Sequence, residues 1–271
     1  MSGPSDRASS GPYADELARV LAALQAVRPL LERYASLDLS VDYKREDHPV
    51  TIADREADDL LREMLPRAGE GWLSEETADD ERRLRDRRVW IVDPLDGTKE
   101  FIKRIPEWSI SIGLVEDGVP VVGGILNPPA NSLVLGAIGH GVTKNGVSAR
   151  TKPWRGYREA EVLASRSEIG RGEWAPFERF GFKIRPVGSV AYKLAEVAAG
   201  TADATWTLVP KSEWDVAAGV ALVRAAGGSV CLPDGSAPLF NQRQPRYPGL
   251  IAFSAESAAH FERALDEVRA R

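Results

Sequence analysis

The sequence predicts an α+β fold in which a lobe built on a largely antiparallel sheet is followed by an α/β lobe. Three observations predict it: two amphipathic helical stretches near the N-terminus, a run of strand-like segments in the middle, and alternating strands and helices after residue 160. The chain has 271 residues, of which 43% are hydrophobic and 28% charged. This composition supports a large buried core and excludes disordered and fibrous proteins.

Two helices open the fold. Apolar residues from Tyr13 to Tyr34 recur at helical spacing, and Pro29 is expected to kink the last turn. A second helix begins at Thr51-Ile-Ala-Asp54 and ends at Pro66. Residues 1–12 are rich in Ser, Gly and Pro and lack an apolar core segment, so they predict a disordered tail rather than a signal peptide.

The middle of the chain predicts antiparallel strands. The strand-like runs are Val89–Val92, Trp108–Val115, Val119–Leu126 and Ser132–Ile138, with turns at Asp117-Gly118 and Asn145-Gly146. The uncharged stretch from Gly118 to Thr143 is long enough to span a membrane. Its prolines and glycines predict strands and turns instead, so no transmembrane segment is expected.

The second half predicts an α/β lobe. Its expected strands are Val162–Ser165, Phe182–Val187, Ala204–Thr207, Ser229–Leu232 and Leu250–Phe253, and its expected helices are Val190–Ala199, Trp214–Ala226 and Ala255–Arg269. The loop Lys152 to Arg158 is the best place for a boundary. We therefore expect two lobes, residues 13–150 and residues 151–271.

Charge and cysteine content limit the partners and the compartment. The net charge of −5 lacks the basic excess of proteins that coat nucleic acid, so a nucleic-acid polymer is not an expected partner. Cys231 is the single cysteine, which excludes an intramolecular disulfide. The cytoplasm is therefore the expected location.

The segment Val89-Trp-Ile-Val-Asp-Pro-Leu-Asp-Gly-Thr98 carries the strongest chemical signal. An apolar strand delivers two carboxylates, Asp93 and Asp96, into a turn shaped by Pro and Gly. Burying carboxylates costs several kcal/mol each unless a positive charge lies between them. An all-oxygen ligand set favours Mg²⁺ or Mn²⁺, and no cluster of Cys and His suggests zinc.

More acidic residues and a phosphate cradle strengthen this interpretation. Glu75-Glu76 follows a short apolar run, while Asp54 and Asp215 begin predicted helices, where each could also act as an N-cap. Backbone N–H groups of Gly97 and Thr98 can bind an anion if the turn opens a helix. A divalent cation beside such a cradle predicts a phosphate substrate.

Four motifs together resemble the inositol monophosphatase superfamily of Mg²⁺-dependent, often lithium-sensitive phosphatases. They are Val50-Thr-Ile-Ala-Asp54, Glu75-Glu76, Asp93-Pro-Leu-Asp-Gly-Thr98, and Trp214-Asp-Val-Ala-Ala-Gly219 followed by Ala226-Gly-Gly228. The resemblance implies a layered αβαβα sandwich with most metal ligands in the first lobe and the substrate-specificity residues in the second. It also implies two or three Mg²⁺ ions per site, with Mn²⁺ as an alternative, inhibition by Li⁺, and a homodimer.

The resemblance assigns roles to individual residues. Asp93, Asp96 and Asp215 would hold one metal, and Glu75, Asp93 and the carbonyl of Leu95 a second. Water activated beside Glu75 would attack phosphorus, oriented and deprotonated by Thr98 with its partner Asp54, while the N–H groups of Gly97 and Thr98 hold phosphate oxygens. The expected substrate contacts are Gly188, Ser189, Lys193 and Glu213, and Lys44 is either a further contact or a solvated charge.

The segment Asp96-Gly-Thr-Lys-Glu-Phe101 is similar to the 3'(2'),5'-bisphosphate nucleotidase branch of CysQ type. The first functional hypothesis is therefore removal of the 3'(2')-phosphate from adenosine 3'(2'),5'-bisphosphate and its sulfated form. The alternative is a phosphatase of inositol phosphate or another small ester, such as histidinol phosphate or fructose 1,6-bisphosphate. A third hypothesis is a metal-binding protein without turnover, against which the complete carboxylate set argues.

Overall fold

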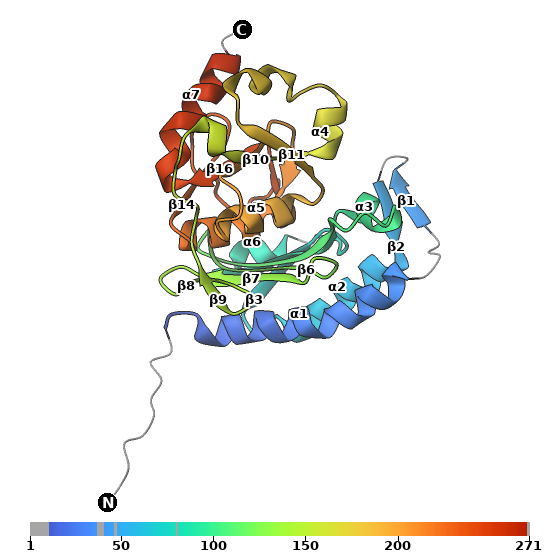
Figure 1. Ribbon diagram of the computed structural model, residues 1–271. Helices are drawn as coiled ribbons and strands as arrows, with labels where there is room; N and C mark the ends of the chain where they lie inside the picture. Colours follow the sequence, from blue (N-terminus) through green and yellow to red (C-terminus); the bar gives the residue numbers. More distant parts are fainter. Residues whose placement is uncertain (1–10, 37–40, 46–47, 80, 270–271) are drawn as a thin grey trace, which may run out of the picture.

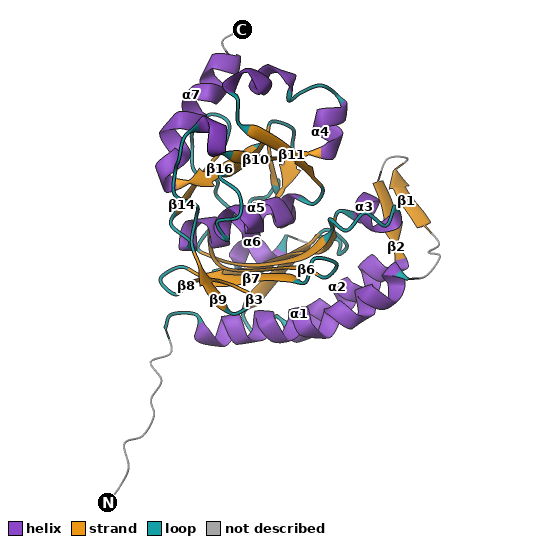
Figure 2. Cartoon of the chain, in the orientation of Figure 1, coloured by secondary structure: helices purple, strands orange, loops and turns teal. Residues whose placement is uncertain are grey.

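The computed structural model describes residues 11–36, 41–45, 48–79 and 81–269, with the backbone alone for residues 41–51 within that range. Five layers are stacked in the order αβαβα (Figures 1 and 2). Helices α1 (Ala14–Ala35) and α2 (Ile52–Met64) form the first layer, and α5 (Val190–Ala198) and α6 (Glu213–Ala225) lie between the two large sheets. Helices α4 (Arg166–Gly170) and α7 (Ala258–Arg269) lie on the far side of the second sheet. The expected αβαβα sandwich is confirmed.

The first large sheet is antiparallel except at one edge. Its strands, in spatial order, are β3 (Glu70–Ser74), β4 (Arg88–Asp96), β5 (Ser109–Glu116), β6 (Val119–Asn127), β7 (Ser132–Ala137), β8 (Gly141–Lys144) and β9 (Val147–Ala149). Only β3 and β4 run parallel. The predicted turns at Asp117-Gly118 and Asn145-Gly146 connect hairpins, and both residues of each turn have positive φ.

The second large sheet is mixed. Its strands, in spatial order, are β11 (Lys183–Val187), β10 (Glu161–Ser165), β12 (Ala204–Thr207), β16 (Leu250–Ser254) and β14 (Gly228–Cys231). β10 is parallel to both of its neighbours, whereas β16 is antiparallel to both of its own. All five strands were expected from the alternating pattern.

Short elements complete the chain, and the sequence did not predict most of them. Strands β1 (Val41–Arg45) and β2 (His48–Thr51) form a hairpin beside helix α3 (Thr98–Ile102), and β13 (Lys211–Ser212) pairs with β15 (Arg246–Tyr247). The 3₁₀ helices are η1 (Arg82–Arg85), η2 (Tyr157–Glu159), η3 (Ala175–Phe180) and η4 (Ala255–Ser257). Two-residue strands and single helical turns carry too little periodicity to stand out from loops.

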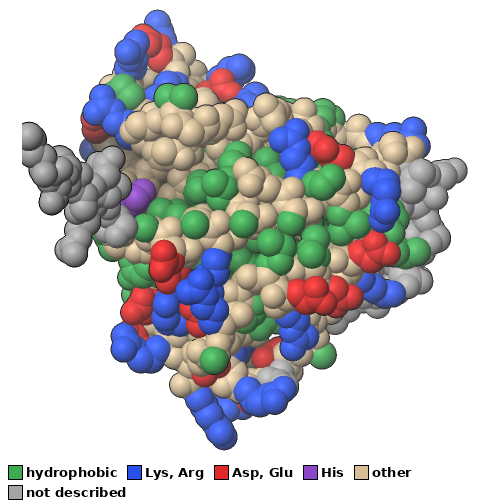
Figure 3. Space-filling view, turned by 90° about the horizontal axis from the view of Figure 1, so that it is seen from below, with side chains coloured by type: hydrophobic (Ala, Val, Ile, Leu, Met, Phe, Trp, Pro, Cys, Tyr) green, Lys and Arg blue, Asp and Glu red, His purple; other side chains and the backbone are tan. Residues whose placement is uncertain are grey.

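Helix α1 covers the outer face of the first sheet. Its residues Leu24, Val27 and Leu31 are fully buried, while small residues such as Ala18 and Ala22 face solvent. Figure 3 shows this side of the molecule, where apolar side chains run between charged ones. The helix continues through Pro29 to Ala35, so proline does not end it. In the described part of the chain, no helix is both long and apolar enough to cross a bilayer.

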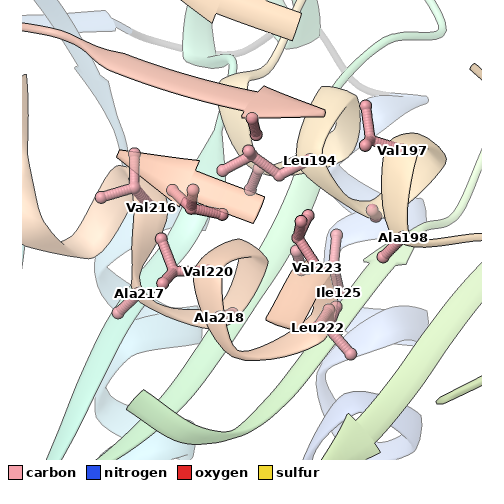
Figure 4. Packing of buried hydrophobic residues seen from close by; sticks show 14 of the residues in the cluster. Ile125, Leu194, Val197, Ala198, Val216, Ala217, Ala218, Val220, Leu222 and Val223 are labelled. Carbon is pink, nitrogen blue, oxygen red and sulfur yellow. The ribbon is translucent and has the colours of Figure 1, made fainter. Parts of the chain in front are cut away.

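Helix α6 packs against the first sheet at backbone distance. A Cβ on Gly113 of β5 would lie 2.8 Å from the Ala218 nitrogen, and one on Gly123 of β6 would lie 2.3 Å from the Ala218 oxygen. Only glycine permits this approach. Figure 4 shows part of the surrounding core, which includes Ala218, Leu222 and Ile125. This close packing holds α6 against β5 and β6, and Asp215 lies in the first turn of the helix.

The two halves of the chain share this core. The chain passes from the first sheet to the second between Ala149 and Glu161, which contains the expected boundary. However, the largest apolar cluster joins first-sheet residues such as Ile91 to second-sheet residues such as Leu163. The division into lobes at residue 150 therefore stays a prediction. Of the expected disordered tail, residues 1–10 lie outside the described residues.

Candidate functional site

Three acidic side chains from distant segments converge. Carboxylate oxygens of Glu75, Asp93 and Asp215 all lie within 4.8 Å of one another. Glu75 follows β3, Asp93 lies in β4, and Asp215 lies in the first turn of α6. These elements meet because β3 and β4 are parallel neighbours and α6 packs on the adjacent strands β5 and β6. The three residues were all expected to be metal ligands.

The site accumulates negative charge around one buried acid: Asp93 is buried, Asp215 is half-buried and Glu75 is exposed. Asp93 is 1% exposed, and burial raises its pKa well above the usual range. Four neighbouring carboxylates raise it further: Glu75, Asp96, Asp215 and Asp54. Burial, followed by the charge of Asp96, raises the pKa of Asp215 to about 6. Ionised carboxylates this close repel one another unless a cation lies between them.

The donor set suits a hard divalent cation. Carboxylate and carbonyl oxygens are the ligands that Mg²⁺ prefers. One oxygen of Asp93 accepts the Leu95 N–H at 3.0 Å, and the carboxylate has a second oxygen that can bind a cation. The Leu95 carbonyl accepts a hydrogen bond from the Thr98 hydroxyl at 3.1 Å and has a second lone pair. The residues present therefore fit a magnesium site of the expected kind.

Asp96 is held differently from the three converging acids. Its Oδ2 accepts hydrogen bonds from the Ser189 hydroxyl and the Ala191 N–H, both at 2.6 Å. Ser189 in turn lies 2.9 Å from the Ser109 hydroxyl. Asp96 is thus not in the group of three, but its charge reaches both Asp93 and Asp215. One of its oxygens ties the turn after β4 to the start of α5.

The expected pair of Thr98 and Asp54 is present. The Thr98 hydroxyl donates to Oδ2 of Asp54 at 3.3 Å across 44 residues of sequence. Asp54 is 3% exposed in the first turn of α2, and Thr98 begins α3. The lone pairs of the Thr98 oxygen can accept a hydrogen bond from water.

Two glycines shape the turns beside these acids. Gly97 has φ of 96° and directly precedes α3. Because Thr98 is the first residue of this helix, its N–H group has no acceptor within the helix. A Cβ on Gly188 would lie 2.6 Å from Glu100, and the Gly188 N–H donates to Glu107 at 2.7 Å. Ser189 has φ of 48° and caps α5 by accepting the Tyr192 N–H. Ser189 therefore reaches the acidic site through Asp96, whereas Gly188 lies against Glu100 and Glu107.

Lys193 and Glu213, two expected substrate contacts, have backbone partners instead. Lys193 is 3% exposed, and its Nζ donates to the carbonyls of Val187 and Ser189. Glu213 is fully buried, and its carboxylate accepts the N–H groups of Asn241 and Gln242. Both side chains hold backbone groups near the site, and their role as substrate contacts stays a prediction. The side chain of Lys44 lies outside the described residues.

Sequence reasoning missed the groups that hold the acids in place. The carboxylate of Asp58 accepts hydrogen bonds from the hydroxyls of Ser74 and Thr77, which bracket Glu75 and Glu76. The one available signal was the position of Asp58, four residues after Asp54 and so on the same face of α2.

A family model agrees with this geometry. The model described as "Inositol monophosphatase family" matches residues 14–270. An inositol-1-monophosphatase of Mesorhizobium japonicum is 36% identical over 80% of this chain and 84% of its own length. A histidinol-phosphatase of Mycobacterium tuberculosis is 36% identical over 83% of this chain and 85% of its own.

Solved structures give the same result. An IMPase of Thermotoga maritima has a TM-score of 0.81 at 27% identity and covers 94% of this chain and 98% of its own. CysQ of Bacteroides thetaiotaomicron, titled a bacterial member of the inositol monophosphatase family, has a TM-score of 0.77 at 29% identity, covering 90% and 98%. The converging acids, the shared fold and the match across the chain agree. The chain belongs to the inositol monophosphatase family and is a phosphoric monoester hydrolase.

Proposed function

We propose that the enzyme hydrolyses the phosphate monoester of a small polyhydroxylated molecule, represented by inositol 1-phosphate, with Mg²⁺ as cofactor. The observation that carries this proposal is the convergence of Glu75, Asp93 and Asp215 within 4.8 Å. A phosphate dianion cannot approach three carboxylates unless a cation lies between them. Dependence on Mg²⁺ is general for the family.

The ligands and their chemistry follow from the site. Glu75, Asp93 and Asp215 would hold the cation, and Asp96 and the Leu95 carbonyl would complete the set. Bound Mg²⁺ neutralises the charge of carboxylates and phosphate and makes water acidic enough to act as a nucleophile near neutral pH. Two or three ions per site, replacement by Mn²⁺ and inhibition by Li⁺ are parts of this proposal.

The chain's own groups would position the reactants. Asp54 holds the Thr98 hydroxyl, whose oxygen would accept a hydrogen bond from the attacking water and orient it toward phosphorus. The N–H groups of Gly97 and Thr98 would bind phosphate oxygens at the start of α3. No covalent phosphoenzyme is required.

The charges around Gly188 favour a substrate that presents hydroxyl groups beyond its phosphate. The nearby cations are already paired: Arg166 with Glu107 at 2.6 Å, Arg185 with Glu161, and Lys193 with backbone carbonyls. Glu100 lies against Gly188, and burial raises its pKa. A second phosphate on the substrate would compete with these pairs, whereas hydroxyls could donate to the acids.

Adenosine 3',5'-bisphosphate is the second candidate substrate, because the Asp96 to Phe101 segment resembles the nucleotidase branch and CysQ is a structural neighbour. Phe101 is buried and packs edge-on against Trp108 at 4.9 Å, and Lys99 is exposed. Glu100 is therefore the one residue of the Lys99-Glu100-Phe101 segment that we place beside Gly188. A single acidic residue is a weak basis for selecting a bisphosphate.

A substrate panel tests the proposal. Phosphate release is measured with Mg²⁺ for inositol 1-phosphate, histidinol phosphate, fructose 1,6-bisphosphate and adenosine 3',5'-bisphosphate, with and without Li⁺, and with Asp93→Asn as the blank. The highest kcat/KM for inositol 1-phosphate is expected. Preference for the nucleotide would establish the second candidate, and Mg²⁺ binding without any hydrolysis would refute both.

Two further properties complete the proposal. We propose that the protein is a homodimer, because the family that it resembles commonly forms dimers. We also propose a cytoplasmic location, because Cys231 is the single cysteine and no intramolecular disulfide is possible. Sedimentation of the purified 29.5 kDa chain would test the dimer directly.

A further inference from the structure

We infer that Asp58 is a positioning residue that fixes the turn carrying Glu75 against helix α2. The inference rests on the proposed function, because it takes Glu75 to be a metal ligand. Asp58 does not belong to the converging acids. Its contacts nevertheless lead directly to them.

The carboxylate of Asp58 holds both ends of the Glu75 turn. Its Oδ1 accepts the Ser74 hydroxyl and its Oδ2 accepts the Thr77 hydroxyl. The Ser74 oxygen also accepts the Glu76 N–H at 3.3 Å. Glu75 thus lies inside a hydrogen-bonded turn, and the residues on either side of the Glu75-Glu76 pair, Ser74 and Thr77, are both bound to Asp58.

Burial makes these hydrogen bonds important. Asp58 is 3% exposed and Ser74 2% exposed. A buried carboxylate loses its solvation and depends on donors to replace it, and hydrogen bonds to an ionised group are among the strongest in proteins. The two hydroxyls, and with them the turn, are therefore held to one place on α2.

The same helix face also holds the second acidic turn. Asp54 lies one helical turn before Asp58, and its carboxylate accepts the Thr98 hydroxyl at 3.3 Å. The turns after β3 and β4 lie at one edge of the sheet, because these strands are parallel and Ser74 pairs in register with Val92. One rigid helix thus sets the spacing between the segments of Glu75 and Asp93.

Magnesium binding to variants tests the inference without turnover. The Mg²⁺ affinity of the full chain is measured by calorimetry, with no substrate, for wild type, Asp58→Ala, Asp58→Asn and the matched control Asp59→Ala. Asp59 is the exposed neighbour on the same helix, so its variant removes the same charge without the turn contacts.

Loss of the carboxylate is expected to weaken Mg²⁺ binding by about tenfold, the lower end of the range for partners that orient metal ligands. Asp58→Asn should retain most of the affinity, because its amide oxygen accepts one hydroxyl and its amide nitrogen donates to the other. Asp59→Ala should bind as wild type does. Metal-free melting temperatures, measured in parallel, separate a folding defect from a metal-binding defect.

Three outcomes decide the matter. Wild-type affinity in Asp58→Ala would overturn the inference and leave Asp58 a packing residue. If Asp58→Ala does not fold, Ser74→Ala combined with Thr77→Val removes the same hydrogen bonds from the other side, and wild-type affinity there overturns the inference equally. A wild-type chain that binds no Mg²⁺ would instead refute the proposed function.

Discussion

Asp93 is the carboxylate that the other acids of the site surround. It is buried, and its pKa is raised by burial and by four neighbouring acids. We expect Asp93→Asn to abolish Mg²⁺-dependent hydrolysis while the metal-free protein melts about 3 °C higher, because a repelled buried carboxylate has been neutralised. Calorimetry with and without Mg²⁺ measures both effects. A lower metal-free melting temperature would contradict the charge argument.

Thr98 is expected to act on water rather than on the metal. Thr98→Ala removes the hydroxyl that Asp54 and the Leu95 carbonyl hold. We expect kcat to fall by about a hundredfold, the lower range for a group that orients and deprotonates a nucleophile, with Mg²⁺ affinity unchanged. Thr98→Ser serves as the control and should keep most of the activity. Full turnover in Thr98→Ala would exclude the role.

At this scale the sequence predicted the acids but not their partners. Asp93 and Asp96 stand out because carboxylates at the end of an apolar strand need a reason to be there. Ser74 and Thr77 carry no such signal, because a serine or threonine in a turn is ordinary in any protein. The loop contacts of Glu213 were also not predicted: its carboxylate accepts the backbone N–H groups of Asn241 and Gln242.

Among the elements, α6 depends on two glycines of the first sheet. A Cβ on Gly123 would lie 2.3 Å from the Ala218 oxygen, a backbone atom that cannot rotate away. We expect Gly123→Ala to cost about 2 kcal/mol of unfolding free energy, because α6 must shift to relieve the overlap. Urea unfolding measures the cost.

The same shift should weaken Mg²⁺ binding, because α6 carries Asp215. Gly170→Ala is the matched control, since a Cβ there would meet nothing within 4 Å. Equal stability and equal Mg²⁺ affinity in both variants would contradict the packing argument.

Helix α1 is joined to β3 and β4 through Glu70. Burial opposes its ionisation, but hydrogen bonds from Arg19, Trp90 and the Arg67 N–H outweigh that effect and lower its pKa from 4.5 to about 2. Glu70 therefore stabilises the fold fully above its ordinary pKa, and this contribution is lost as the pH falls through about 2.

We expect Glu70→Gln to lower the unfolding free energy by on the order of 2 kcal/mol at neutral pH. The difference from wild type should narrow below pH about 4.5. Denaturant unfolding across that pH range gives both quantities, and the exposed Glu63→Gln is the control. A difference that widens in acid would have the wrong sign for a lowered pKa.

Elements were predicted where periodicity was long. Helices α1, α2 and α6 carry several turns of apolar spacing, and the Asp-Gly and Asn-Gly turns mark two hairpins. The hairpin of β1 and β2 was also missed. The pair of β13 and β15 was missed because strands of two residues are specified by the neighbours they meet rather than by their own pattern.

Across the whole molecule, metal binding should stabilise more than its own neighbourhood. The proposed ligands come from β4, α6 and the turn after β3, so a bound cation connects segments that separate on unfolding. At Mg²⁺ concentrations a hundredfold above the dissociation constant we expect about 2.7 kcal/mol of added stability. EDTA should reverse it, and thermal melting at several Mg²⁺ concentrations measures it. An unchanged melting temperature would contradict a site that exists only in the folded chain.

The order of the layers was predictable, but the packing of a helix from the second half of the chain on the sheet of the first half was not. The change from a strand-rich to an alternating pattern after residue 160 predicts two lobes. It does not reveal that α6, from the second half, packs on Gly113 and Gly123 of the first. Such contacts depend on shape across more than ninety residues of sequence, which no local pattern records.

The late position of α6 in the chain has a consequence during translation. When the ribosome has released the first sheet, Glu75, Asp93 and Asp96 are already made, but the helix that supplies Asp215 and covers β5 and β6 is not. A nascent chain at that stage exposes apolar strands and an incomplete set of acids. Phosphatase activity is therefore expected only from chains that already include α6, and fragments ending before α6 should be inactive.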